Sequence, residues 1–267
     1  MRKFSISIFV LLIYLLLITY TLAARFFGVD YQPIFTPLIT LLAFIFAVLH
    51  GGMCLGWKRA FLLLGLTVAV SLFFESIGVA TGWVYGPYHY TDMLGVKFLG
   101  LVPFLIPVAW YMMSYSSFVI AARLVPSQRS VWTWRFLVAG LGAVAMTAWD
   151  LAMDPLMVAG GHWVWEVGGD YFGVPIQNFW GWWLTIFVAF ILFLAISRVK
   201  PGNLFLTEPE YTRLAVLSYG AIGLSSIVAN FQIGLAGPGL AGLFAMLPWF
   251  LLGWLRFTED KLPQSQT

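Results

Sequence analysis

The strongest constraint in this sequence is a series of long apolar runs separated by short polar segments. Eight such runs follow one another, at about 4–24, 34–55, 60–79, 98–124, 136–153, 178–197, 212–235 and 238–255. A helix crosses a hydrocarbon core of about 30 Å with about 20 apolar residues, whereas a membrane strand needs only about 10. The sequence therefore predicts an all-α, polytopic integral membrane protein with about eight transmembrane helices, in one domain covering residues 1–267.

The composition supports a membrane protein and narrows its chemistry. Hydrophobic residues make up 61% of the chain and charged residues 9%, against about 45–50% and about 25% in soluble domains. The single cysteine, Cys54, excludes an internal disulfide, and no phosphate-binding loop, zinc-binding pattern or nucleotide fingerprint occurs. From the absence of these motifs we expect no metal and no cofactor. We also expect no nucleic-acid partner, because the net charge of +3 follows from membrane topology.

The basic residues predict how the chain is oriented in the membrane. If the N-terminus is cytoplasmic, Arg25 and Lys97 fall outside the cytoplasmic segments and all other Lys and Arg residues fall within them. This asymmetry is the positive-inside pattern, so both termini are predicted to be cytoplasmic, in a bacterial or archaeal cell membrane. The first apolar run exceeds the core of about 7–15 residues in a signal peptide, so we expect it to be a retained helix.

One stretch, residues 148–183, combines acidic and aromatic residues without any Lys or Arg. It holds Asp150, Asp154, Glu166 and Asp170 together with six of the 13 tryptophans. Carboxylates without counter-charges are costly in an apolar setting, which makes this stretch the first candidate for chemistry. Asp150 and Asp154 are four residues apart and share one helix face, where two close carboxylates cannot both ionise easily. One of them would keep a proton near neutral pH, as a general acid requires.

Structural roles are the alternatives for these carboxylates. We expect the helix to end at Pro155, and Asp154 in front of that proline could simply stop one helix and cap the next. Glu75 lies within an apolar run, where an ionisable residue indicates a functional site. Its alternative is an interfacial carboxylate hydrogen-bonded to Ser71 or Ser76. The predicted topology places all three carboxylates near the outer surface of the membrane.

A faint internal repeat relates the two acidic regions. GWVYGPYHYTDMLGV (82–96) resembles HWVWEVGGDYFGV (162–174), with two residues of slip. A duplication of the units 60–97 and 136–177 would place their outer loops side by side. The alternative is that aromatic-rich interfacial loops look alike by composition.

The aromatic residues allow two interpretations. Trp and Tyr anchor proteins at membrane interfaces, but aromatic faces also stabilise cations. The loop histidines, His89 and His162, are candidates for binding, with a solvated side chain as the alternative. Buried acids, aromatics and no cofactor motif together favour proton-initiated chemistry on an alkene of a lipid substrate. A proton-coupled membrane transporter of a lipophilic substrate is the rival hypothesis.

Five segments resemble the membrane-integral carotenoid-biosynthesis family: FESIGVATGWVYGPYHYTDMLG, VPFLIPVAW, AWDLAMDPLMV, WVWE and YFGVPIQNFWGWW. That family includes carotenoid 1'-hydratases (γ-carotene 1'-hydroxylases) and bisanhydrobacterioruberin hydratases, and the resemblance covers about residues 71–186. It implies cofactor-free hydration of the terminal 1',2' double bond of an acyclic ψ end group, as in γ-carotene or lycopene, to a tertiary alcohol. The implied partners are a carotenoid, the lipid bilayer and other carotenoid-biosynthesis enzymes. A more distant resemblance to membrane lycopene cyclases makes end-group cyclisation the nearest alternative.

With this resemblance, we expect Asp150 or Glu75 to be the acid. The other carboxylate, or Asp154, would be the base that positions water. The expected substrate-binding residues are Trp83, Tyr85, Tyr88, His89, His162, Trp163, Trp165, Glu166, Asn178 and Trp182. Of these, Trp163, Trp165 and Tyr85 are expected to surround the cation.

Overall fold

Each long apolar run forms a helix, because backbone groups inside a membrane must find their hydrogen-bond partners within their own segment. The structure, a computed structural model, describes residues 2–259 of the chain. The helices in that range are α1 (Arg2–Phe26), α2 (Phe35–Cys54), α3 (Trp57–Thr81), α4 (Leu105–Leu124), α5 (Val131–Ala159), α6 (Ile176–Ile196), α7 (Pro209–Gln232) and α8 (Ala236–Glu259). All eight are long and apolar enough to cross a membrane, which confirms the predicted architecture.

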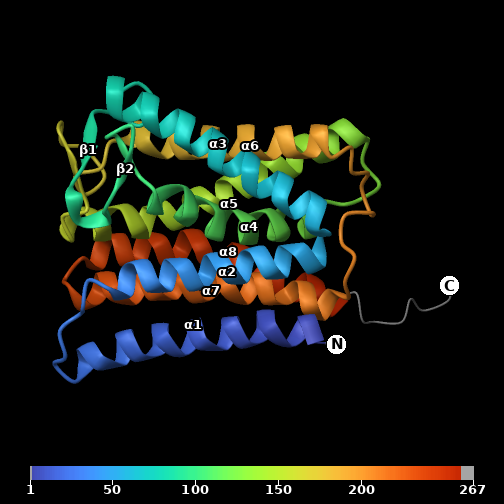
Figure 1. Cartoon of the computed structure of the whole chain (residues 1–267), viewed down its shortest axis with the longest axis horizontal. Coiled ribbons are helices and arrows are strands. Elements are labelled where there is room, and N and C mark those ends of the chain that lie inside the picture. The colour runs from blue at the N-terminus through green and yellow to red at the C-terminus, as the bar shows by residue number, and fades with distance from the viewer. Residues whose placement is uncertain (1, 260–267) are drawn as a thin grey trace.

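Helix α4 is the centre of the bundle (Figure 1). In its apolar window 83% of the residues are buried, against 28% in α1 and α8, and it contacts α2, α3, α5, α7 and α8. Two of its buried serines, Ser114 and Ser117, donate to carbonyl oxygens of their own helix. Such bonds satisfy polar groups locally, so the helix can be surrounded by other helices on all sides.

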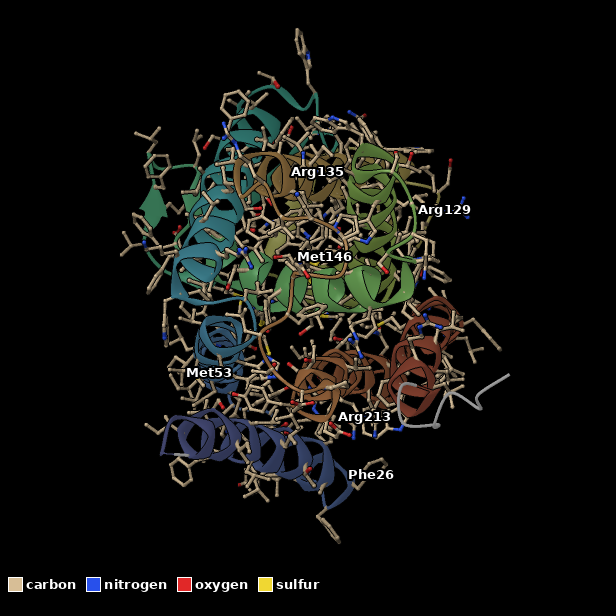
Figure 2. All side chains as sticks on the ribbon, turned by 90° about the vertical axis from the view of Figure 1, so that its right-hand side faces the viewer. Phe26, Met53, Arg129, Arg135, Met146 and Arg213 are labelled. Carbon is tan, nitrogen blue, oxygen red and sulfur yellow. The ribbon has the colours of Figure 1, made fainter. Side chains whose placement is uncertain are left out.

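Helix α1 begins and α8 ends at the same end of the bundle (Figure 1). The connections α2–α3, α4–α5 and α6–α7 lie at that end as well, and Figure 2 looks onto it, with Arg129, Arg135 and Arg213 in view. Lys97 lies at the opposite end, where its Nζ donates to Asp92 Oδ1 at 2.8 Å. The basic residues therefore separate between the two ends as the positive-inside pattern requires. The cytoplasmic position of the termini stays a prediction.

The prediction that the fourth helix begins at residue 98 and contains Pro103 is wrong. This part of the chain forms a hairpin instead, in which β2 (Lys97–Phe98) pairs antiparallel with β3 (Val102–Pro103). Helix α4 begins after the hairpin, so Pro107 falls in its first turn. The missing N–H of a proline leaves no helical hydrogen bond unmade there.

The prediction that Pro155 ends the fifth helix is also wrong, because α5 continues past it. Proline lacks the N–H that would bond to the carbonyl of Leu151, four residues earlier. The hydroxyl of Tyr171 donates to that carbonyl at 2.8 Å instead, so the following loop replaces the missing hydrogen bond. Asp154 therefore lies inside the helix, one turn after Asp150, and does not cap a helix end.

This replacement can be tested by a double-mutant cycle. We expect Tyr171→Phe to lower the free energy of unfolding by about 1–2 kcal/mol, because the Leu151 carbonyl loses its donor. In a Pro155→Ala background the alanine N–H can bond to Leu151, so the same change should cost less. Thermal unfolding of the purified protein in detergent measures both losses. Equal losses in the two backgrounds would contradict the replacement.

The two outer loops lie side by side, at the end of the bundle opposite the start of α1 (Figure 1). Strand β1 (Tyr88–Tyr90) pairs antiparallel with β4 (Trp163–Trp165), and the short helix η1 (Asp92–Leu94) follows β1. The register is Tyr88↔Trp165, His89↔Val164 and Tyr90↔Trp163. The internal repeat aligns residues 83–85 with β4, whereas the strand that pairs with β4 comes later, so duplication stays a hypothesis. Successive strand residues point to opposite faces, so the tyrosines and tryptophans share the inner face.

Candidate active site

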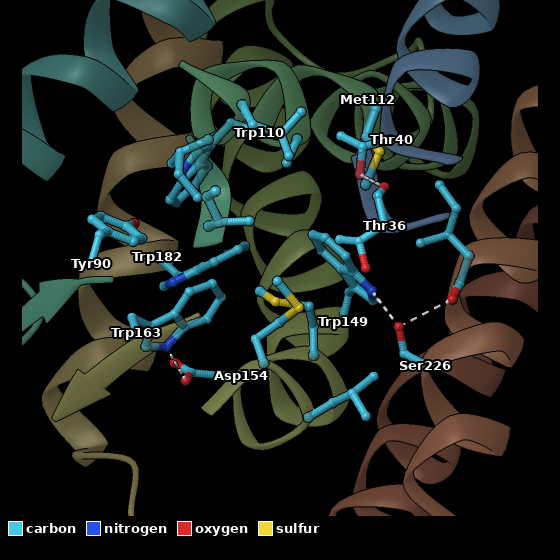
Figure 3. A pocket seen from close by; sticks show the side chains of 18 of the residues that line it. Thr36, Thr40, Tyr90, Trp110, Met112, Trp149, Asp154, Trp163, Trp182 and Ser226 are labelled. Atoms are coloured by element: carbon cyan, nitrogen blue, oxygen red, sulfur yellow. Dashed lines mark hydrogen bonds between the residues drawn. The ribbon is translucent and has the colours of Figure 1, made fainter. Parts of the chain in front are cut away.

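A cavity lies under the paired strands and among α2–α7. Two carboxylates line it, Glu75 from α3 and Asp154 from α5. Its walls carry nine aromatic residues, which are Tyr31, Tyr85, Tyr88, Tyr90, Trp110, Trp149, Trp163, Trp165 and Trp182. Figure 3 shows part of this cavity, with Trp149 near its middle. A cavity with few polar groups in fixed places is the usual form of a small-molecule site.

Glu75 is held by three neutral donors. Its Oε2 accepts hydrogen bonds from the hydroxyls of Tyr88 and, at 2.9 Å, of Tyr90. Its Oε1 accepts from Trp110 Nε1 at 2.9 Å. Burial, and after it the charge of Glu75, raises the pKa of both tyrosines well above the usual value of a phenol. The two hydroxyls therefore stay protonated, and they remain able to accept as well as to donate.

Asp154 also has three neutral donors, but none of them can accept. Its Oδ1 accepts from Trp163 Nε1 at 2.8 Å and from Trp165 Nε1 at 3.2 Å. Asn178 Nδ2 donates to Asp154 Oδ2 at 2.8 Å and to Asp150 Oδ2 at 2.7 Å. The second oxygen of Asp150 is buried and has no hydrogen-bond partner among the described residues.

The paired strands connect the two cavity carboxylates. In both Tyr–Trp pairs across the strands, the tyrosine donates to Glu75 and the tryptophan donates to Asp154. Residues that are directly opposite in an antiparallel pair lie on the same face. One short ladder therefore holds donors for both carboxylates.

Among the side chains that the structure describes, no cation balances these carboxylates. In the part of the chain whose side chains are described, none of Glu75, Asp150 and Asp154 forms an ion pair. Nor do the described residues include a group of His, Cys, Asp and Glu side chains placed to hold a metal ion. Buried carboxylates in one enclosed region cannot all be ionised, so the cluster keeps at least one proton. Indole and amide N–H groups only donate, which favours an ionised Asp154. A tyrosine hydroxyl beside Glu75 can instead turn to accept a hydrogen bond from the carboxyl O–H of a protonated Glu75.

Three tryptophans form a continuous wall of the cavity. Trp110 and Trp182 stack with ring centroids 4.2 Å apart, and Trp149 meets Trp182 edge-on at 6.0 Å. Together with the uncharged tyrosines, these π-systems give a setting that suits a cation. The cluster thus combines carboxylates, which can give or take a proton, with an aromatic wall that suits a cation.

The Tyr85 side chain packs between α3 and α6. A Cβ added at Gly78 would lie 2.6 Å from the Tyr85 ring, and one added at Gly181 would lie 2.4 Å from it. The ring therefore fits only because both helices have glycine at this level. Its hydroxyl hydrogen-bonds with Thr185 Oγ1 at 2.8 Å.

We expect Gly181→Ala to lower the free energy of unfolding by about 1–3 kcal/mol, because the new methyl group overpacks the Tyr85 ring. Gly140→Ala is the matched control, since a Cβ at Gly140 meets nothing within 4 Å. That control should be neutral or stabilising by up to about 1 kcal/mol. Thermal unfolding in detergent compares the two. If Gly181→Ala were as stable as the control, Tyr85 would not be confined by the glycine.

The structure brings most of the predicted site residues together. The cavity is lined by Glu75, Tyr85, Tyr88, Asp154, Trp163, Trp165, Asn178 and Trp182. Asp150 is fully buried and does not face the cavity, because Asn178 lies between it and Asp154. The predicted residues outside the cavity are Trp83, His89, His162 and Glu166.

The local backbone explains why these residues do not reach the cavity. His89 lies between two inward-facing tyrosines and points outward, where its Nδ1 is 3.5 Å from Glu166 Oε1. Trp83 follows α3 in a turn and is 81% exposed. His162 folds back onto the end of α5, with Nδ1 3.3 Å from the Met157 carbonyl oxygen, and burial lowers its pKa.

Tyr90, Trp110 and Trp149 are among the cavity residues that were not predicted from the sequence. Tyr90 could have been found, because it is two residues after Tyr88 in a strand and so shares its face. Trp149 precedes Asp150, but the sequence has no local signal that it points into a cavity. Trp110 donates to Glu75 from a helix 35 residues away, and such a long-range contact has no local signature.

Comparisons with known proteins identify related sequences. Residues 35–248 match the sequence model of a family described as carotenoid biosynthesis protein. A Haloarcula japonica protein named bisanhydrobacterioruberin hydratase is 37% identical over 136 residues, which are 51% of this chain and 45% of that relative. The matched part is thus less than half of the relative's length. No solved structure matches the chain.

Proposed function

The chain belongs to the carotenoid biosynthesis protein family, and from this membership we propose that it hydrates the acyclic ψ end of a carotenoid such as γ-carotene or lycopene. The terminal 1',2' double bond would take a proton at C-2' and a hydroxyl at C-1', giving a tertiary alcohol. The name of the Haloarcula japonica relative supports a hydratase. The observation that carries the proposal is the cavity, in which two carboxylates lie among aromatic rings and differ in their partners. The partners of Glu75 include hydroxyls, which can also accept a hydrogen bond, whereas the N–H partners of Asp154 only donate.

In the proposed first step, Glu75 is the general acid. Its O–H bond breaks and the proton forms a C–H bond at C-2', so the π electrons of the double bond are used and a tertiary cation remains at C-1'. Tyr88 and Tyr90 donate to Glu75, and these donors stabilise the carboxylate that forms. The faces of Trp110, Trp165 and Trp182 would stabilise the cation.

In the proposed second step, Asp154 is the base. Its carboxylate orients a water molecule, and an oxygen lone pair of this water bonds to C-1' while Asp154 takes one of its protons. Asn178 and the indoles of Trp163 and Trp165 hold the carboxylate in place. Asp150 shares the Nδ2 donor of Asn178 with Asp154 and would tune the protonation of Asp154. A proton must then pass from Asp154 back to Glu75, and Tyr88, Tyr90 and water can relay it.

The apolar part of the cavity suits the polyene. Its partly or fully buried lining includes Leu105, Ile106, Ala109, Met112 and Met157. These side chains come from the start of α4, its second and third turns, and the end of α5. A ψ end group could therefore reach the carboxylates while the rest of the chain stays in an apolar environment. Association with other carotenoid-biosynthesis enzymes stays a prediction.

Production of the protein in a host that accumulates lycopene or γ-carotene tests the proposal. Pigments extracted from the membranes and analysed by mass spectrometry should gain the mass of one water per reacted end. An unchanged mass with a shifted retention time and spectrum would indicate cyclisation of the same cation instead. If no ψ-ended carotenoid is converted although the protein is present in the membrane, the enzyme hypothesis fails in favour of transport or assembly.

A further inference from the structure

The cavity has a second arm, on the other side of Trp149 from Asp154 (Figure 3). The side chains of this hydroxyl arm come from α2, α7 and the loop before α2. They are Tyr31, Thr36, Thr40, Ser225 and Ser226. None of the steps proposed above uses them.

The hydroxyl arm presents mainly hydrogen-bond acceptors. Thr40 Oγ1 donates to the Thr36 carbonyl at 2.8 Å, and Ser225 Oγ donates to the Ile222 carbonyl at 2.8 Å. Ser226 Oγ donates to the Ile222 carbonyl at 3.3 Å and accepts from Trp149 Nε1 at 3.1 Å. A hydroxyl whose proton is already used offers only lone pairs, so the arm fits a ligand that donates hydrogen bonds.

Burial increases along the arm. Tyr31 and Thr36 are partly exposed near the start of α2, whereas Thr40 and Ser226 are buried. The start of α2 lies at the same end of the bundle as the paired strands (Figure 1). The arm thus runs from that end inward to Trp149, beyond which Asp154 lies (Figure 3). Ser226 fixes the Trp149 ring between the two halves of the cavity.

Hydration consumes one water molecule in each turnover, but the groups that contact Glu75 and Asp154 are aromatic side chains and one amide. From these contacts we infer that the hydroxyl arm is the water-binding path to the cation and that Trp149 divides it from the end group. The inference rests on the proposed hydration. Water is the small donor that a row of acceptor hydroxyls fits, and an ordered water makes about two to four hydrogen bonds to such groups.

The chemistry of the cation provides a readout for water supply. When water reaches C-1', a C–O bond forms and the alcohol results. When it does not, a C–H bond at C-2' or at a methyl group breaks, Glu75 takes the proton back, and an alkene returns. In heavy water the acid delivers deuterium, so an alkene that returns after losing hydrogen carries deuterium. Deuterium in recovered substrate therefore reports the acid step, and the alcohol reports the arrival of water.

The test uses membranes that contain the full chain, lycopene as the probe, and heavy water. The combined variant Thr36→Val/Thr40→Val/Ser225→Ala removes three hydroxyls with little change in volume. We expect the yield of alcohol to fall about tenfold, while deuterium in recovered lycopene stays the same or rises. Thr36→Ser/Thr40→Ser keeps the hydroxyls and should restore the ratio of alcohol to deuterated lycopene. Thr19→Val is the matched control, because Thr19 makes the same bond to a backbone carbonyl on an exposed face of α1.

Two results would overturn the inference. An unchanged yield of alcohol would show that water reaches the cation by another route. An equal fall in alcohol and in deuterium would show that the hydroxyl arm binds the carotenoid itself. The failure of the proposed function looks different, because the unmodified protein would then produce neither alcohol nor deuterated lycopene.

Discussion

Replacement of Glu75 by glutamine is expected to abolish hydration while the protein still accumulates in membranes. The carboxamide has almost the same shape but carries no acidic proton. General acid catalysis contributes about 10²–10⁴-fold to rate, so conversion should fall by at least that range. Because the acid step itself is lost, recovered substrate should contain no deuterium after incubation in heavy water. Mass spectrometry of the extracted pigments measures both quantities.

The matched control for this variant is Glu166→Gln. It makes the same chemical change on the outer face of the strands, where Glu166 lies near His89 and outside the cavity. Conversion should be close to that of the unmodified protein. A Glu75→Gln variant with full conversion would remove Glu75 from the mechanism.

Replacement of Asp154 by asparagine is expected to separate the two steps. Hydration should fall by about 10²–10⁴-fold, because the base that activates water is lost. Deuterium should still enter recovered substrate, because Glu75 can protonate C-2' and take the proton back without Asp154. Loss of both signals in a stably folded variant would instead assign the acid step to Asp154.

The folding of this variant needs its own control. An asparagine amide at position 154 would face the amide of Asn178, which now donates to the carboxylate. Asn178 also donates to Asp150, so the exchange has to include that residue. The triple variant Asp150→Asn/Asp154→Asn/Asn178→Asp exchanges donors and acceptors at all three positions and should accumulate in membranes even if the single variant does not. The amount of protein and its thermal unfolding in detergent check this point.

Much of the fold could be predicted, because the membrane restricts it so strongly. Runs of about 20 apolar residues have to be helices, and the basic residues separate between the two ends of the bundle as the positive-inside pattern requires. The helix ends were harder. Pro155 is compatible with a continuing α5 only because Tyr171, from the next loop, bonds to Leu151. Such a compensation depends on tertiary contacts, which cannot be predicted from the helix propensity of the local sequence.

The candidate site was predictable where the argument rests on the free-energy cost of a buried carboxylate and on the spacing of residues along a helix. Glu75 and Asp154 were identified because a carboxylate in an apolar run needs a reason to be there, and both line the cavity. The histidines were predicted from their residue type alone. The strand β1, whose alternation turns His89 outward, was not predicted. The role of Trp149 as a divider depends on its bond to Ser226 of α7. Contacts between distant helices of this kind are set by packing and leave no pattern in the sequence.

The β1–β4 ladder has a consequence for how the reaction responds to its membrane. Its strands are about 4.7–4.9 Å apart, and this spacing separates the tyrosines that hold Glu75 from the tryptophans that hold Asp154. Bilayers of different thickness change the tilt of helices, but they do not stretch main-chain hydrogen bonds. Changing the acyl length of the surrounding lipid should therefore alter how readily the polyene enters between helices. The turnover of a carotenoid already bound should be nearly indifferent to it.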